Sequence, residues 1–377
     1  MKLKIQKLKF LRNIIIGVVA LFIVSFIINI APGYKRNKYR NVINLVIGDE
    51  NVTENLKNNI IKDEDGTLYI SEADIKEYFD KTLYYDENEN SIIATSEMAT
   101  ARMKFGEKRI NINGIETDTL AEIKKEGDTI YIPIKDMKSV YNLEIKYLEN
   151  KNILIIDKLS EGMIKAEADK TSTIRYKQRS LSKSLGELEE GDIVCAFYTT
   201  SKGWRLIRTE DGTVGYVKAN VLTNEYILRQ DMNQKPQTKS INANVANNSS
   251  LKLEGTNVVI KDLLQVTLDG IFIKNTEIQN DENTETWVNL KLNNANLDTY
   301  DDRIKLAKDI TVIARKNGIN GINVECNGKP DEKLERFIIE LAPLMRELGI
   351  KTNIVSTTKI NEEKFTDIVD YIIITNQ

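Results

Sequence analysis

The 377-residue sequence contains no histidine. Histidine is the commonest general base near neutral pH, the usual partner of a nucleophilic serine or cysteine, and a frequent ligand of transition metals. Its absence excludes catalytic bases, nucleophile pairs and metal sites that depend on an imidazole. We therefore expect neither a metal nor a cofactor.

Cysteine is almost as scarce. The two cysteines, Cys195 and Cys326, lie far apart, and neither belongs to a CxxC pair. Their isolation gives no support to a zinc site, a redox motif or a disulfide. We expect two buried, unreactive thiols.

An excess of positive charge is also missing. The formal net charge is −3 and the isoelectric point is about 5.6. This balance gives no electrostatic basis for binding nucleic acid. The length is that of a protein with two to four domains.

A long uncharged run lies near the start of the chain. Residues 14–31 carry no charge, and they are about as many as a helix needs to cross a bilayer. We predict a transmembrane anchor over 13–32, a cytoplasmic tail over 1–12 and an extracytoplasmic remainder, and hence a single-pass protein of the cell membrane. The predicted orientation depends on a small difference in charge, because basic residues also follow the run.

A repeat with an offset of 62 residues organises the segment 42–160. "DGTLYISEADIKEYFDKTLYYDENENSIIAT" at 65–95 matches "GDTIYIPIKDMKSVYNLEIKYLENKNILIID" at 127–157. Each copy predicts a strand, a short amphipathic helix and a hairpin, so we expect a duplicated α+β domain. The segment resembles the copper amine oxidase N-terminal-like domain, a stalk module of Gram-positive cell-surface proteins. Since no histidine could hold copper, the resemblance implies a spacer or a contact with the cell wall.

The segment 161–228 alternates short strand patterns with turn residues, as in "GW" at 203–204 and "GTVGYV" at 212–217. It resembles a bacterial SH3-type domain, which implies a small all-β barrel. In that resemblance Trp204 and Tyr216 line an aromatic groove for wall peptide or glycan. The alternative is that Trp204 simply completes a small core.

A polar linker is expected over 229–252, and the pattern then changes to strands alternating with helices. This alternation predicts a parallel sheet within 253–377. One strand, "GINVECNG", places Asn323, Glu325 and Asn327 on one face, although a strand covered by helices should be apolar on both faces. Because sites in such folds gather at the carboxyl ends of strands, the polar face predicts a site.

This strand resembles the fourth-strand signature Asp-x-x-Asp-x-Asp-x-Glu of family 18 glycoside hydrolases, at Asn320, Asn323, Glu325 and Asn327. The resemblance implies a TIM-type barrel that cleaves N-acetylglucosamine polymers, with a glutamate as acid and the acetamido group as nucleophile. Asn327 has no proton to donate, and Glu325 lies two residues from the acid position. We expect a vestigial, non-catalytic site whose Asn323, Glu325 and Asn327 still contact ligand. The alternative is that these side chains only satisfy one another.

The last strand pattern, near 371–375, corresponds to the sixth of the eight strands that a complete barrel has. The expected fold is therefore multidomain: a transmembrane helix, an α+β repeat, a small SH3-like barrel and an incomplete TIM-type barrel. The unfinished edge would be covered by a protein partner or a second copy, would be closed in another way, or would belong to the product of a decaying gene.

Three functions remain open. The first is a membrane-anchored, non-catalytic envelope protein that binds wall glycan or peptide, or scaffolds other envelope proteins. Its partners would be the bacterial membrane and the cell wall, and not nucleic acid. The second is an active family 18-type glycosidase with Glu325 as the acid. The third is a structural protein that completes its barrel with another subunit.

Overall fold

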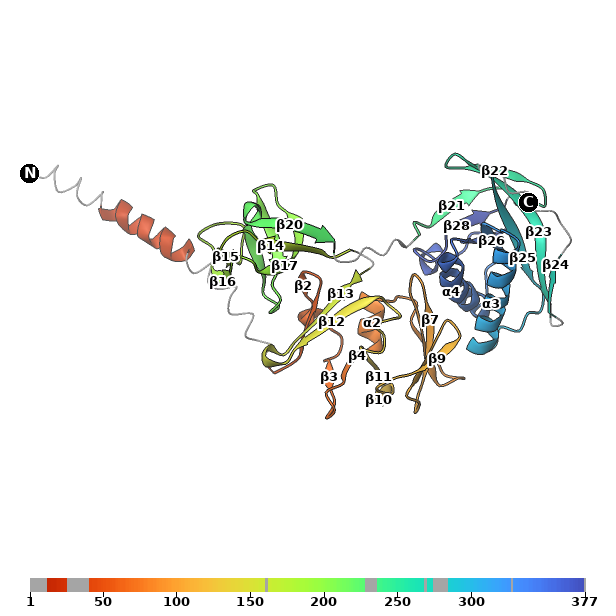
Figure 1. Cartoon of the computed structure of the whole chain (residues 1–377), viewed down its shortest axis with the longest axis horizontal. Coiled ribbons are helices and arrows are strands. Elements are labelled where there is room, and N and C mark those ends of the chain that lie inside the picture. The colour runs from red at the N-terminus through yellow and green to blue at the C-terminus, as the bar shows by residue number, and fades with distance from the viewer. Residues whose placement is uncertain are drawn as a thin grey trace, which may run out of the picture. The chain divides into compact units, whose positions relative to one another are not determined.

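The structure is a computed structural model. It describes residues 12–25, 41–159, 162–227, 236–267, 270–273, 284–326 and 328–375. The chain forms two compact units, each assembled from two separate stretches (Figure 1). The first unit comprises Met1–Ile60 and Glu144–Gln230, and the second comprises Ile61–Leu143 and Asp231–Gln377.

Residues 12–25 form a helix with exposed side chains. Within the described ranges, no helix is both long and apolar enough to cross a membrane. This finding overturns the predicted anchor over 13–32, and with it the single-pass membrane localisation. Residues 1–11 and 26–32 of the predicted tail and anchor lie outside the described residues.

The first unit contains two sheets. In the four-stranded sheet, β1 and β13 are parallel neighbours at the centre, and β12 and β2 form the edges. The seven-stranded sheet is antiparallel, in the order β16-β15-β19-β18-β17-β14-β20, and its two ends do not join. The strands and short 3-10 helices are β1 (Asn44–Ile47), β2 (Glu50–Asn51), η2 (Thr53–Asn55), β12 (Leu143–Leu148), η3 (Glu149–Lys151), β13 (Ile153–Lys158), β14 (Ile164–Ala168), β15 (Ser172–Arg175), β16 (Ser184–Leu188), β17 (Ile193–Thr199), β18 (Trp204–Arg208), β19 (Val214–Lys218), η5 (Ala219–Val221) and β20 (Leu222–Ile227).

The second unit holds the middle of the repeat segment in two further sheets, ordered β10-β11-β4-β3 and β5-β6-β7-β8-β9. One short helix, α2 (Glu72–Tyr78), begins where the Ser71 hydroxyl accepts a hydrogen bond from the Asp74 amide, which is a typical helix N-cap. The strands are β3 (Ile61–Lys62), β4 (Leu68–Ser71), β5 (Tyr84–Asp86), β6 (Ser91–Thr95), β7 (Thr100–Lys104), β8 (Arg109–Ile112), β9 (Ile115–Asp118), β10 (Lys124–Glu126) and β11 (Thr129–Pro133).

The two copies of the repeat carry the same strands and the same turn. Strand β4 corresponds to β11, and the β5–β6 hairpin corresponds to β12–β13. Both hairpins turn at an asparagine with left-handed backbone, Asn90 (φ 46°) or Asn152 (φ 56°). Its side-chain oxygen accepts a hydrogen bond from Tyr85 (2.9 Å) in the first copy and from Tyr147 (2.7 Å) in the second. Asparagine tolerates this backbone region better than most residues.

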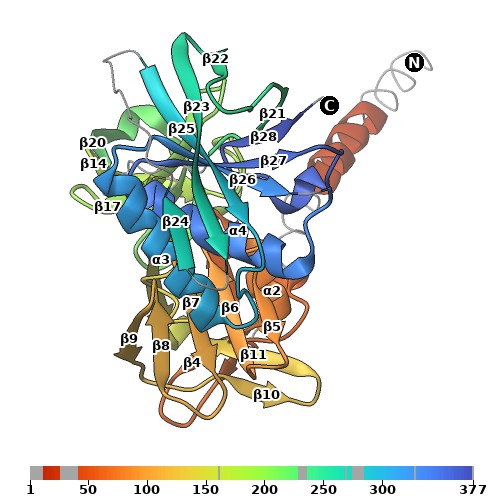
Figure 2. The same cartoon turned by 90° about the vertical axis from the view of Figure 1, so that its right-hand side faces the viewer.

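The largest sheet has the order β21-β28-β27-β26-β25-β23-β22, with β24 paired to β23. Helices α3 and α4 lie on one face of it (Figure 2), where they bury Val288, Ile322 and Ile354. The elements are β21 (Lys239–Asn242), β22 (Ser250–Leu253), β23 (Thr256–Thr267), β24 (Gly270–Ile273), β25 (Thr284–Leu292), α3 (Tyr300–Lys316), β26 (Gly321–Cys326), α4 (Glu332–Glu347), β27 (Lys351–Ser356), η6 (Glu362–Lys364) and β28 (Tyr371–Ile374).

The predicted TIM-type barrel and the predicted small SH3-like barrel are both wrong, because the sheets are open half-barrels in a chain that is mostly β-sheet. In the largest sheet the reason lies in the segment 229–252, which was expected to be a linker. It supplies β21, which pairs in parallel with β28, and most of β22, which pairs with β23 at the opposite edge. The edge that was expected to need a partner is thus paired within the chain.

Candidate functional site

The polar face of β26 forms part of a buried ladder of asparagines. Asn323 is in register with Asn289 of β25 and Asn353 of β27. The Asn353 amide donates to Oδ1 of Asn323 (2.9 Å), and the Asn323 amide donates to Oδ1 of Asn289 (3.0 Å). All three side chains are buried. The side-chain amide of Asn323, which the sequence predicts to contact a ligand, is therefore hydrogen-bonded to its neighbours inside the molecule.

The chain itself covers this ladder. The amide of Asn289 donates to the carbonyl of Val245 (2.8 Å) and to Oδ1 of Asp262 (2.7 Å). Val245 is buried against Trp287 and Tyr371 on the face of the sheet opposite the helices. The segment between β21 and β22, which we call the strap (residues 243–249), therefore lies where the resemblance implied a sugar.

Glu325 shares the face of Asn323 but has a cation beside it. Nζ of Lys291 lies 3.8 Å from Oε1 of Glu325 and 3.2 Å from Oδ2 of Asp262. Asn320 lies at the opposite end of β26, where its Oδ1 accepts a hydrogen bond from the backbone of Thr286 (2.9 Å). The structure thus brings Asn323 and Glu325 together but separates Asn320 from them, and Asn327 lies outside the described residues.

The two aromatic residues predicted in the first unit have different environments. Trp204 is only 5% exposed, and Nζ of Lys218 lies 4.3 Å from its ring centre, so it packs as a core residue. Tyr216 is half-buried and lines a groove. Its hydroxyl lies 3.0 Å from that of Tyr198.

This groove has a volume of about 870 Å³ and runs between the two sheets of the first unit. Three tyrosines, Tyr176, Tyr198 and Tyr216, line it, and we call it the tyrosine groove. Apolar residues Val46 and Leu206 also line it. Sequence reasoning found only Tyr216, because Tyr176 and Tyr198 approach it through strand pairing between distant segments.

Two contacts hold the walls of the tyrosine groove together. Arg208 of β18 makes two hydrogen bonds to the Asp157 carboxylate of β13, at 2.8 and 2.5 Å, in a buried position. Gly212 has φ +80°, and a Cβ there would lie 3.1 Å from Leu148. Glycine therefore allows the β18–β19 hairpin to approach the four-stranded sheet closely.

The tyrosine groove combines neutral phenols with acidic groups. The hydrogen bond with Tyr216 is the largest cause that raises the pKa of Tyr198, to about 12, so Tyr198 stays neutral at ordinary pH. Burial acts to raise the pKa of Asp211, but the side chains of Lys151 and Thr209 outweigh it and hold that pKa well below the usual range. Asp49 and Glu50 also line the groove, and no ion-pair partner of theirs lies among the described residues.

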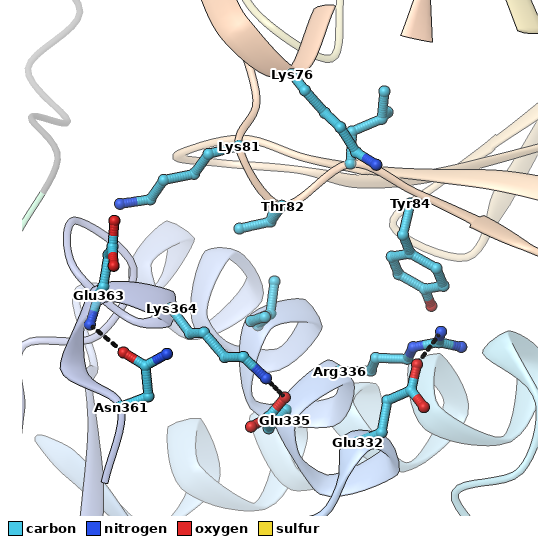
Figure 3. A pocket seen from close by; sticks show the side chains of 12 residues that line it. Lys76, Lys81, Thr82, Tyr84, Glu332, Glu335, Arg336, Asn361, Glu363 and Lys364 are labelled. Atoms are coloured by element: carbon cyan, nitrogen blue, oxygen red, sulfur yellow. Dashed lines mark hydrogen bonds and ion pairs between the residues drawn. The ribbon is translucent and has the colours of Figure 1, made fainter. Parts of the chain in front are cut away.

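A second cavity, of about 650 Å³, lies in the second unit between the α2–β5 region and α4 (Figure 3). Its charged groups are largely paired: Lys364 with Glu335 and Arg336 with Glu332, both at 2.5 Å. The Arg336 guanidinium also lies 3.9 Å from the ring centre of Tyr84. These contacts join parts of the second unit.

The residues present do not fit copper. Histidine is absent, and the described residues contain no group of three or more acidic or cysteine side chains that could hold a metal. Both cysteines are free and buried, as predicted. Burial raises the pKa of the Cys326 thiol to about 12, which keeps it protonated and unreactive.

The comparisons with known proteins support one of the three resemblances. No curated protein matches the chain. The comparisons give no support to an SH3-type or a glycoside hydrolase domain. Residues 46–156 match the family described as copper amine oxidase N-terminal domain, which confirms the resemblance predicted for the repeat segment.

Proposed function

We propose that this chain is a non-catalytic binding protein that contacts cell-wall glycan or peptide through the tyrosine groove. The observation that carries the proposal is a groove of about 870 Å³ lined by Tyr176, Tyr198 and Tyr216. Tyrosine rings offer apolar faces with polar tips, and they are enriched at binding surfaces for that reason. The side chain of Tyr198 is 52% exposed, so a ligand can reach it without any rearrangement.

The proposal is tested by sedimentation of the full-length chain with purified cell wall. We expect the wild type to pellet with the wall and Tyr198→Ala to bind about tenfold more weakly, since loss of a central aromatic contact typically costs 1–2 kcal/mol or more. Tyr226→Ala is the matched control, because Tyr226 is an exposed tyrosine of the same sheet that does not line the groove. Equal binding by all three proteins would refute the proposal.

The same preparation tests the alternative of hydrolysis with Glu325 as the acid. Nζ of Lys291 lies 3.8 Å from the Glu325 carboxylate, whereas the general acid of a glycosidase must present a proton to the glycosidic oxygen. We expect no release of reducing ends from wall or chitin. Release that disappears in Glu325→Gln would support the glycosidase instead.

A further inference from the structure

The charges of the tyrosine groove do not balance. Its one lysine, Lys151, is paired to the Asp211 carboxylate and also donates to the backbone oxygen of Asp211 (3.0 Å). Arg208, behind the groove, is paired with Asp157. Two carboxylates, Asp49 and Glu50, remain without a cation among the described residues, so the groove is acidic where a ligand would enter.

An aromatic ring lies beside these carboxylates. Asp49, Glu50 and Tyr198 all line the same groove, and the negative charge of Asp49 is one of the smaller influences that raise the pKa of the Tyr198 phenol. A primary ammonium between them would gain both the attraction of the carboxylate and a cation–π contact with the ring. Tyr176 already has such a contact, because Nζ of Lys177 lies 5.8 Å from its ring centre. Because the ring of Tyr176 already has a cation, we expect an added amine to contact the ring of Tyr198.

The remaining walls suit an aliphatic peptide better than a sugar. Val46, Leu206 and Val214 line the groove, and they match the methylene stem of a lysine-like side chain. The neighbouring strand β2 is the last in its sheet, so one edge of its backbone is open among the described strands. An extended peptide can add hydrogen bonds to such an edge, which a glycan cannot do in register.

We propose that the tyrosine groove binds a peptide that carries a free primary amine on an aliphatic side chain, held by Asp49 and Glu50 beside Tyr198. This inference rests on the proposed function and narrows the proposed ligand from wall glycan or peptide to wall peptide. A glycan of neutral N-acetylated sugars would leave both carboxylates without a partner.

The test measures binding of the full-length chain to three labelled probes: a wall stem peptide with a free lysine ε-amine, the same peptide with that amine acetylated, and a tetramer of N-acetylglucosamine. We expect the free-amine peptide to bind at least tenfold more tightly than the other two, and more weakly as salt rises. Asp49→Asn combined with Glu50→Gln should remove that preference, so that the free-amine and acetylated peptides bind with similar affinity. Glu210→Gln, a nearby exposed carboxylate outside the groove, should behave as wild type.

The outcomes separate this inference from the proposed function. Tyr198-dependent binding to wall, together with equal affinity for the free and acetylated peptides or tighter binding of the sugar tetramer, overturns the inference and retains the function. Failure to bind wall and all three probes overturns both. Thermal melting of each variant shows whether a loss of binding reflects a loss of folding.

Discussion

Asp80 is a carboxyl group whose surroundings make the stability of the fold depend on pH. It is buried and accepts hydrogen bonds from the backbone of Thr95 (2.6 Å), the hydroxyl of Thr82 (2.6 Å) and the hydroxyl of Tyr141 (3.0 Å). Burial is the largest influence and raises its pKa above the ordinary 3.8, while the hydrogen bonds oppose it. Tyr141 lies 62 residues after Phe79, the matching position of the other repeat copy, and the two rings stack at 6.2 Å.

A raised carboxyl pKa in the folded state favours the protonated form there. The contribution of Asp80 to the free energy of unfolding is therefore fully present below about pH 3.8 and is lost as the pH rises through the folded-state pKa. We expect the difference in free energy of unfolding between wild type and Asp80→Asn to fall with rising pH, because the amide does not titrate. Urea titrations at several pH values measure it. A difference that stayed constant or grew with pH would contradict this prediction.

The asparagine ladder joins three neighbouring strands, because β25, β26 and β27 each contribute one asparagine side chain to a single row of hydrogen bonds. Replacing Asn323 with leucine would leave Oδ1 of Asn289 and Nδ2 of Asn353 without their partners. Each buried unsatisfied group costs about 1–3 kcal/mol. We expect Asn323→Leu to lower the free energy of unfolding by about 2–4 kcal/mol and to leave wall binding unchanged.

The control for this prediction is Asn293→Leu, since Asn293 is exposed and should tolerate the change within about 0.5 kcal/mol. Urea denaturation gives the stabilities, and sedimentation with wall gives the binding. Loss of wall binding in a folded Asn323→Leu protein would show that the ladder contacts ligand, contrary to this reading.

The sequence predicts the position of β26 and which residues lie on each of its two faces, because alternation of apolar and polar residues is a local signal. It could not indicate the ladder, since Asn289 and Asn353 become neighbours of Asn323 only through the register of the sheet. The strap was also hidden. Its composition is polar, and Val245 is buried only because β21 and β22 pair with opposite edges of the same sheet. Similarly, Tyr198 of β17 and Tyr216 of β19 come close only because both strands pair with β18, one on each side.

At the scale of the molecule, the repeat does not form one separate stalk. Its strands are divided between the two compact units. In the second unit, Tyr84 of β5 contacts a buried ion pair between the two long helices. Arg303 of α3 and Glu340 of α4 are fully buried, with Nε and Oε2 2.8 Å apart. The Tyr84 hydroxyl accepts from Arg303 (2.8 Å) and donates to Glu340 (3.0 Å).

Removing one partner of a buried ion pair leaves an uncompensated charge, which typically costs about 3–5 kcal/mol, whereas replacing both with apolar residues is far less costly. We expect Arg303→Met to destabilise the second unit by about that amount and Arg303→Met with Glu340→Met to recover most of the loss. Hydrogen exchange measures the protection of the repeat strands and of the largest sheet in one experiment. Strands β6 and β26 should lose protection together in the single variant. Loss in β26 alone would show that the repeat strands fold independently of the helices.

Hydrogen exchange of the full-length chain with and without solubilised wall fragments tests the central claim most directly, because it locates the contact. We predict slower exchange at 44–51 and 206–216, which border the tyrosine groove, and no change at 321–326 in the strand that resembles a glycosidase signature. Slower exchange at 321–326, with none around the groove, would contradict the binding site proposed for this protein.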